Sequence, residues 1–326
     1  MNIRSSSPRQ YTSTTTPDNR IVEPTPRHGE RALVLGGGGS TGNAWLIGVI
    51  AGLFEAGLDV TTADLTVGTS AGSTAAAQIA TSTPAELLAA TVDQAPQHRT
   101  GVVEPDRVRV PAGPMADHLE RMRGIIAASD GVADFRRRMG AAALDAEAAS
   151  DGSWSSRWRD VVAARLPGAE WPDRTMLLTA VDAHTGEPVV FDRHSGVDVI
   201  DAVAASTAGG RSPYSIGACK YIDGGYRSNA ENADLAAGYW RVLVLSPMAG
   251  RSFHPLKWGT HLASQVEDLR AHGSVVETIF PADDSEHLFG ANAMNLSLRP
   301  PAARVGYHQG KALAARLTEF WHGPIA

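Results

Sequence analysis

The sequence contains a single cysteine and only three lysines, and each scarcity excludes a class of protein. Cys219 stands alone among 326 residues, so the chain forms no internal disulfide and no cysteine-based zinc site. Such cysteine usage suits a reducing compartment, and we expect a cytoplasmic protein. Arginine supplies nearly all of the positive charge, and the net charge of −6 argues against a nucleic-acid partner.

Long apolar runs and metal-binding clusters are also missing. No apolar stretch approaches the length of a membrane span, and no signal-like region follows Met1, so we expect any membrane contact to be peripheral. No His, Cys, Asp and Glu cluster has useful metal-ligand spacing, so we expect no metal. The hydrophobic share of 43% is nevertheless enough to build a sizeable core.

Composition and apolar patterning divide the chain into two stretches, and the second contains a segment with two interpretations. The first 30 residues are rich in Ser, Thr, Pro and Arg without an apolar period, which predicts a disordered N-terminal extension. Residues 31–326 alternate apolar strands with helices, which predicts a mostly parallel α/β sheet with helices on both faces. Within them, residues 94–171 have two interpretations. They form a helical cap or lid facing lipid, or they pack on the core with Arg136–Arg138 in solvent.

Apolar runs and their spacing give the expected elements. A pair of strands around a hairpin-like connection, at 176–181 and 188–191, is followed later by a strand–helix–strand unit. In such sheets the site lies at the carboxyl ends of the strands. The other expected strands are 31–35, 64–67, 241–245 and 275–280, and the expected helices include 73–80, 84–88, 117–123, 132–139, 198–205, 256–271 and 302–321.

The most informative stretch is Gly68-Thr69-Ser70-Ala71-Gly72, which lies between an expected strand and an expected helix. A G-x-S-x-G turn in that context is the pattern of a nucleophile elbow. Gly68 and Gly72 allow a sharp turn where a Cβ would clash, and the helix N-terminus favours an alkoxide on Ser70. The other interpretation is a glycine-rich turn without chemistry.

A second motif, GGGGSTG over residues 36–42, follows the first expected strand and opens a helix. The spacing of Leu46, Val49, Ile50 and Leu53 predicts that this helix buries one face. Consecutive glycines expose backbone N–H groups beside a helix N-terminus, an arrangement that binds a phosphate or an oxyanion. No acidic residue follows at the distance that a dinucleotide fold requires, and no Gly-Lys-Ser/Thr completes a P-loop. With a serine turn downstream, the pattern favours an oxyanion loop.

The third motif, Asp223-Gly224-Gly225, follows a short apolar strand and on its own would indicate a hairpin turn. Together the three motifs resemble the patatin-like phospholipase family. Its pattern is Gly-Gly-Gly-x-Arg/Lys-Gly, then Gly-x-Ser-x-Gly, then Asp-Gly-Gly or Asp-Gly-Ala. The resemblance extends from about Ala32 to Val244 and implies a three-layer α/β/α fold.

The resemblance also implies a catalytic dyad and an activity. Ser70 would be the nucleophile and Asp223 the base that takes its proton, with a basicity raised by desolvation. The backbone N–H groups of Gly37, Gly38 and Gly39 would bind the oxyanion. The implied reaction is hydrolysis of a carboxylic ester of a lipid through an acyl-Ser70 intermediate, for which we expect no metal and no organic cofactor. Phospholipid, lysophospholipid and neutral lipid all remain open as substrates.

Two positions depart from the family pattern. Thr41 stands where the family has Arg or Lys, which puts a preference for anionic head groups in doubt. The family's Ala-Ser-x-Ala-x-Pro segment is Ala205-Ser206-Thr207-Ala208-Gly209-Gly210 here, so glycine replaces proline at 210 and loosens that turn.

These departures leave two other functions open. An acyltransferase would use the same serine turn, although related acyltransferases often carry histidine where this chain has Thr69. A non-catalytic module would hold a phosphate or acyl chain in the glycine loop. A conventional Ser-His-Asp triad lacks support, because none of seven histidines that follow Ser70 in the chain lies in a motif that marks a base. These histidines are His184, His194, His254, His261, His272, His287 and His308.

Overall fold

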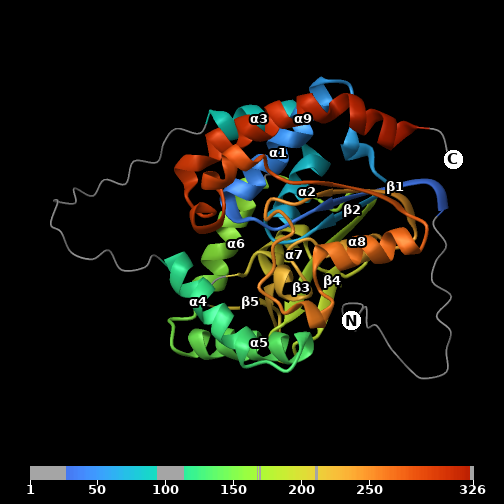
Figure 1. Cartoon of the computed structure of the whole chain (residues 1–326). Coiled ribbons are helices and arrows are strands. Elements are labelled where there is room, and N and C mark those ends of the chain that lie inside the picture. Colours follow the sequence, from blue (N-terminus) through green and yellow to red (C-terminus); the bar gives the residue numbers. More distant parts are fainter. Residues whose placement is uncertain (1–26, 94–113, 167, 169, 210–211, 324–326) are drawn as a thin grey trace, which may run out of the picture.

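The computed structural model describes residues 27–93, 114–166, 168, 170–209 and 212–323. An eight-stranded sheet forms its centre, with helices on both faces (Figure 1). The strands are β1 (Arg27–Leu35), β2 (Leu65–Gly68), β3 (Thr175–Asp182), β4 (Pro188–Phe191), β5 (Tyr214–Ile216), β6 (Cys219–Asp223), β7 (Tyr239–Leu245) and β8 (Val275–Ile279). The α-helices are α1 (Gly39–Glu55), α2 (Ala71–Thr81), α3 (Pro84–Val92), α4 (Pro114–Ala127), α5 (Val132–Ala148), α6 (Trp154–Arg165), α7 (Val199–Ser206), α8 (Leu262–Ala271) and α9 (Arg299–His322).

The sheet is mostly parallel, as the sequence predicts. Its strands follow the order β5-β6-β3-β2-β1-β7-β8, and β4 pairs with β3 outside that path. The pairs β1–β2, β1–β7, β2–β3 and β7–β8 are parallel, whereas β4 and β6 pair antiparallel with β3. The predicted hairpin is β3–β4 and the predicted strand–helix–strand unit is β7–α8–β8. Both predictions are confirmed.

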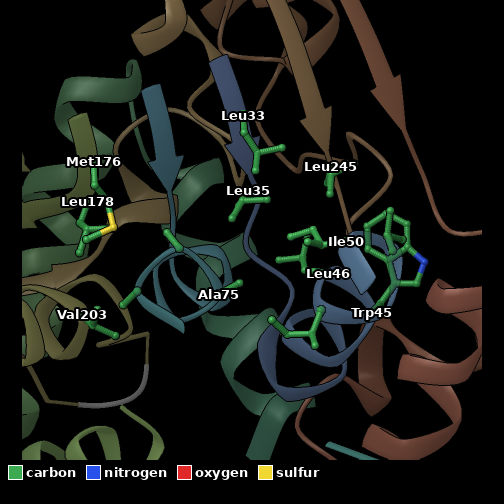
Figure 2. Close-up of a cluster of buried hydrophobic side chains, with 14 of the residues drawn as sticks. Leu33, Leu35, Trp45, Leu46, Ile50, Ala75, Met176, Leu178, Val203 and Leu245 are labelled. Carbon is green, nitrogen blue, oxygen red and sulfur yellow. The ribbon is translucent and has the colours of Figure 1, made fainter. Parts of the chain in front are cut away.

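Side chains of β1 alternate between two hydrophobic clusters, one on each face of the sheet. Leu33 and Leu35 belong to the larger cluster, which includes residues of α1, α2, α7 and α9 (Figure 2). Ala32 and Val34 belong to the other, which includes residues of α8. Successive strand residues point to opposite faces, so the two clusters lie on opposite faces of the sheet. The sheet is therefore the middle layer of a three-layer α/β/α fold.

Helix α1 is buried on nearly all sides rather than along one face, because α9, α3 and α2 all contact it. It lies along α9 (Figure 1), and glycines on both helices allow the backbones to approach closely. A Cβ added at Gly48 would lie 2.1 Å from the carbonyl oxygen of Ala303, and one at Gly306 would lie 2.4 Å from that of Trp45. All residues from 40 to 53 are therefore buried, whereas the apolar spacing in the sequence predicts burial along one face of the helix.

Helices α4 and α5 pack on the sheet through a third cluster. Ile126 and Phe135 belong to one buried cluster with side chains of β3 and β6, which matches the packing interpretation of residues 94–171. Arg136 departs from that interpretation: it is not in solvent but donates to the carbonyl oxygens of Gly186 and Arg227. Residues 94–113 lie outside the described residues, and a lid stays a prediction.

Some boundaries differ from the expected ones for identifiable reasons. β1 begins at Arg27, so the last four residues of the expected extension belong to the strand, and residues 1–26 lie outside the described residues. α9 begins at Arg299 because Pro300 and Pro301 occupy its first turn, where proline is tolerated. Residues Leu256–Trp258 form a separate 3₁₀ turn before α8. Strand β5 was not anticipated. Within the described residues, no helix is long and apolar enough to span a membrane.

The contact between α1 and α9 gives a stability prediction. Gly48→Ala places a methyl group against the backbone of α9, and we expect it to lower the free energy of unfolding by about 3 kcal/mol. Gly124→Ala in α4 is the matched control, because nothing lies within 4 Å of the added carbon. We expect it to be neutral or stabilising by up to about 1 kcal/mol. Urea denaturation measures both, and equal shifts would contradict the close-packing account.

Candidate active site

The pairing register of β3 brings two distant segments together. Leu178 has Cα partners in β2 and β4, and Ala180 has partners in β6 and β4, so β2 and β6 follow one another along the same edge of β3. β2 ends at Gly68, the partner of Leu178, and β6 ends at Asp223, the partner of Ala180. The serine turn and the aspartate turn therefore meet at the carboxyl end of β2, as expected for such a sheet.

Ser70 occupies the junction of β2 and α2 in a strained conformation. Its φ is 51° and its ψ is −115°, a combination that non-glycine residues rarely adopt and that costs on the order of 1–3 kcal/mol. Its Oγ donates to Asp223 Oδ2 at 2.8 Å, and its backbone N–H donates to Ser206 Oγ at 3.0 Å. Ser70 is partly exposed, so the hydroxyl has both a carboxylate acceptor and access to solvent.

The two glycines of the serine turn are required by close backbone approach. A Cβ at Gly68 would lie 2.7 Å from Ser73 Cα, and one at Gly72 would lie 1.9 Å from the carbonyl oxygen of Leu35. Either contact would push α2 away from the sheet. Both positions of this strand–turn–helix junction therefore require glycine.

The carboxylate of Asp223 is almost removed from water, with 8% of the residue exposed. Its Oδ1 accepts from the Gly225 N–H at 2.8 Å, and its Oδ2 accepts from Ser70. Burial raises the pKa of Asp223 to about 6, and the hydrogen bonds from Gly225 and Ser70 oppose that rise. The group is thus a stronger base than an ordinary aspartate and is still mostly ionised at neutral pH.

The glycine loop borders the serine, but its glycines are not equivalent. A Cβ at Gly37 would lie 3.4 Å from Ser70 Cβ, yet Gly37 is buried and its N–H donates to the carbonyl oxygen of Ala230 at 2.7 Å. In this structure that N–H is not free to bind an oxyanion. The N–H groups of Gly38 and Gly39 have no partner among the described residues, and both residues are partly exposed.

Comparison with known proteins places the chain in a family. A family model for patatin-like phospholipase matches residues 33–234, more than half of the chain. The chain belongs to the patatin-like phospholipase family. The resemblance carried by the three motifs is confirmed, and the expected three-layer α/β/α fold agrees with the observed one.

Two solved structures align with most of this patatin-like chain. VipD from Legionella pneumophila is 14% identical with a TM-score of 0.39, over 89% of this chain and 67% of VipD. The type III effector protein ExoU is 13% identical with a TM-score of 0.30, over 88% of this chain and 54% of ExoU. The chain thus spans about two thirds and about half of these proteins. Comparison with curated proteins finds no match.

At the position of the family's Arg or Lys, Thr41 is fully buried within α1 and its Oγ1 has no partner among the described residues. A cation nevertheless lies at this end of α1, contributed by α9. Arg299 donates to the carbonyl oxygen and Oγ of Ser40 and to Asn43 Oδ1. Burial lowers its pKa to about 10, so it stays charged at neutral pH. Gly210, the second departure, lies outside the described residues.

Sequence reasoning missed a polar pair behind the aspartate. The hydroxyl of Tyr226 donates to the carbonyl oxygen of Gly209 and lies 3.2 Å from His118 Nε2. Gly209 in turn lies beside Asp223, because an added Cβ there would be 2.8 Å from Oδ2. His118 is on α4, 105 residues before the aspartate in sequence, and no local motif marks it. Within the described residues, no group of three or more His, Cys, Asp or Glu is arranged to hold a metal ion.

The burial of Asp223 gives a titration prediction. We expect the carboxyl group to titrate with a midpoint near pH 6, measured by ¹³C NMR of aspartate-labelled protein. Ser70→Ala removes a hydrogen bond to the ionised form, so the pKa should rise further. A midpoint near the ordinary value of about 4 would contradict the burial argument.

Proposed function

We propose that the protein hydrolyses a carboxylic ester of a lipid through an acyl-Ser70 intermediate, with Asp223 as the base. The observation that carries this proposal is the 2.8 Å hydrogen bond from Ser70 Oγ to Asp223 Oδ2. A serine hydroxyl becomes a useful nucleophile when an adjacent base accepts its proton. Among the described residues, Ser70 Oγ forms a hydrogen bond only with this carboxylate, which favours a dyad over a histidine-containing triad.

The reaction runs in two halves. In the first, Asp223 takes the Ser70 proton as Oγ attacks the ester carbonyl carbon, and the proton passes to the leaving alcohol as the C–O bond breaks. In the second, Asp223 takes a proton from water, whose oxygen attacks the acyl carbon, and the proton returns to Ser70 as the fatty acid leaves. Each half passes through a tetrahedral oxyanion that needs hydrogen-bond donors.

We propose Gly38 and Gly39 as the backbone donors to that oxyanion. Gly37 was included in the sequence-based expectation, but its N–H already donates to Ala230. The helix α1 begins at Gly39, so the positive end of its dipole adds to the stabilisation of negative charge. Losing one such donor typically costs about 10²–10³ in rate.

Family membership supports a lipid as substrate, and phospholipid or lysophospholipid is the class we propose. We place the activity in the cytoplasm, with peripheral contact to a membrane where the lipid resides. The free thiol of Cys219 is exposed, which is compatible with a reducing compartment.

The proposed dyad is tested by two substitutions. Ser70→Ala removes the nucleophile and Asp223→Asn removes the base while keeping its shape. Each should lower fatty-acid release from phospholipid–detergent micelles by about 10³-fold or more. Ser156→Ala and Asp268→Asn, at exposed positions on α6 and α8, are the controls and should keep full activity. Full activity in either dyad variant, with its fold verified by circular dichroism, would contradict the proposal.

The raised pKa of Asp223 predicts the pH profile. The base must be ionised, so kcat/KM should fall about tenfold for each pH unit below 6 and level off above pH 7. Initial rates with a soluble p-nitrophenyl ester measure this profile, and far-UV circular dichroism at each pH shows that the protein remains folded. A profile that stays flat down to pH 5 would indicate that Asp223 is not the base.

A further inference from the structure

A segment outside all three motifs contacts each of them. In the segment 229–232, the carbonyl oxygen of Ala230 accepts from the Gly37 N–H of the glycine loop at 2.7 Å. The carbonyl oxygen of Glu231 accepts from Thr69 Oγ1 at 3.4 Å, beside the serine. Asn229 Oδ1 accepts from the backbone N–H groups of both Glu231 and Asn232, which fixes the segment's own shape.

The side chain of Asn232 makes the central contacts. Its Nδ2 donates to Thr69 Oγ1 at 3.0 Å and to the carbonyl oxygen of Gly224 at 3.0 Å. Its Oδ1 accepts from Arg227 Nη1 at 3.1 Å, and because a guanidinium only donates, the orientation of the amide is fixed. Asn232 has no exposed surface, so water does not replace these bonds when they are lost.

The two residues that Nδ2 joins are the immediate neighbours of the proposed dyad. Thr69 precedes Ser70, and Gly224 follows Asp223. Thr69 and Gly224 come directly after β2 and β6, which each pair with β3 but form no ladder with one another in the described sheet. The amide of Asn232 therefore bridges a gap that the sheet's own hydrogen bonds leave open.

We propose that Asn232 is a positioning residue that sets the distance between Ser70 Oγ and the Asp223 carboxylate by tying Thr69 to Gly224. This role rests on the proposed hydrolase function. Asn232 does not touch the reacting atoms and acts through the two backbone turns. A misplacement of about 1 Å between reacting groups can cost about 10²-fold in rate, so one buried amide has a large effect on turnover.

The conformation of Asn232 explains the residue type and guides the choice of variant. Its φ is 54° and its ψ is 43°, the left-handed region that asparagine and aspartate tolerate better than other non-glycine residues. Asn232→Asp keeps this tolerance, the side-chain size and the acceptor for Arg227. The substitution replaces the Nδ2 group, which donates two hydrogen bonds, with an oxygen that only accepts. This oxygen would face the carbonyl oxygen of Gly224, and two acceptors repel one another.

A second variant removes the acceptor in the hydrogen bond between Asn232 and Thr69. Thr69→Val is nearly isosteric and removes the hydroxyl that accepts from Asn232. The hydroxyl also bonds Thr179 Oγ1 at 3.0 Å, so Thr69 is fully buried in a polar network, and we expect a lower melting temperature as well. Asn295→Asp is the control for an added charge, because Asn295 uses its Oδ1 as an acceptor for Ser297, which aspartate retains.

The experiment measures kcat, KM and the rate constant of inactivation by a fluorophosphonate, well below each variant's melting temperature. For Asn232→Asp we expect kcat and the inactivation rate constant to fall together by about 10²-fold, with KM changed less than threefold. Thr69→Val should lose about tenfold, and the double variant should lose no more than Asn232→Asp alone, because both break one link. Asn295→Asp should behave as wild type.

The outcomes separate the two proposals. A lower melting temperature with unchanged kcat in the folded variants would overturn the positioning role and leave the hydrolase function standing. Additive losses in the double variant would also overturn it, since the two residues would then act independently. A wild-type protein that neither turns over ester nor reacts with the fluorophosphonate would overturn the hydrolase function and the positioning role together.

Discussion

The hydrogen bond between Ser70 and Asp223 is the interaction on which the site depends. It joins two turns that lie 153 residues apart in the chain, and it forms because β2 and β6 end two positions apart along the same edge of β3. The close backbone approach at Gly68 and Gly72 keeps α2 against the sheet, and the positive φ of Ser70 lies at the junction between them.

Burial of the carboxylate has two opposing effects on the role proposed for Asp223. Desolvation makes Asp223 more basic, which suits proton transfer from a hydroxyl, but it also favours the protonated form, which cannot accept a proton. Two hydrogen bonds, from Gly225 and Ser70, partly offset the desolvation. The resulting pKa of about 6 lies about one unit below neutral pH, which suits the general base that we propose.

The sequence predicted the sheet, the helix layers and the three motifs because each depends on local patterns: apolar strands, glycines at sharp turns and an aspartate after a strand. It did not predict which glycine N–H groups remain free, because the partner of Gly37 is the carbonyl group of Ala230, nearly 200 residues away. Asn232 and His118 were missed for the same reason, since their contacts arise only from the register of β3 and the packing of α4. The burial of α1 was underestimated because α9 comes from the far end of the chain.

The most direct test of the account is the site of covalent reaction with a fluorophosphonate, read by intact mass and peptide mapping of the wild-type protein. The account predicts a single adduct on Ser70, absent from Ser70→Ala and formed far more slowly in Asp223→Asn. An unmodified wild-type protein, or an adduct on another serine, would contradict the claim that the buried carboxylate activates Ser70.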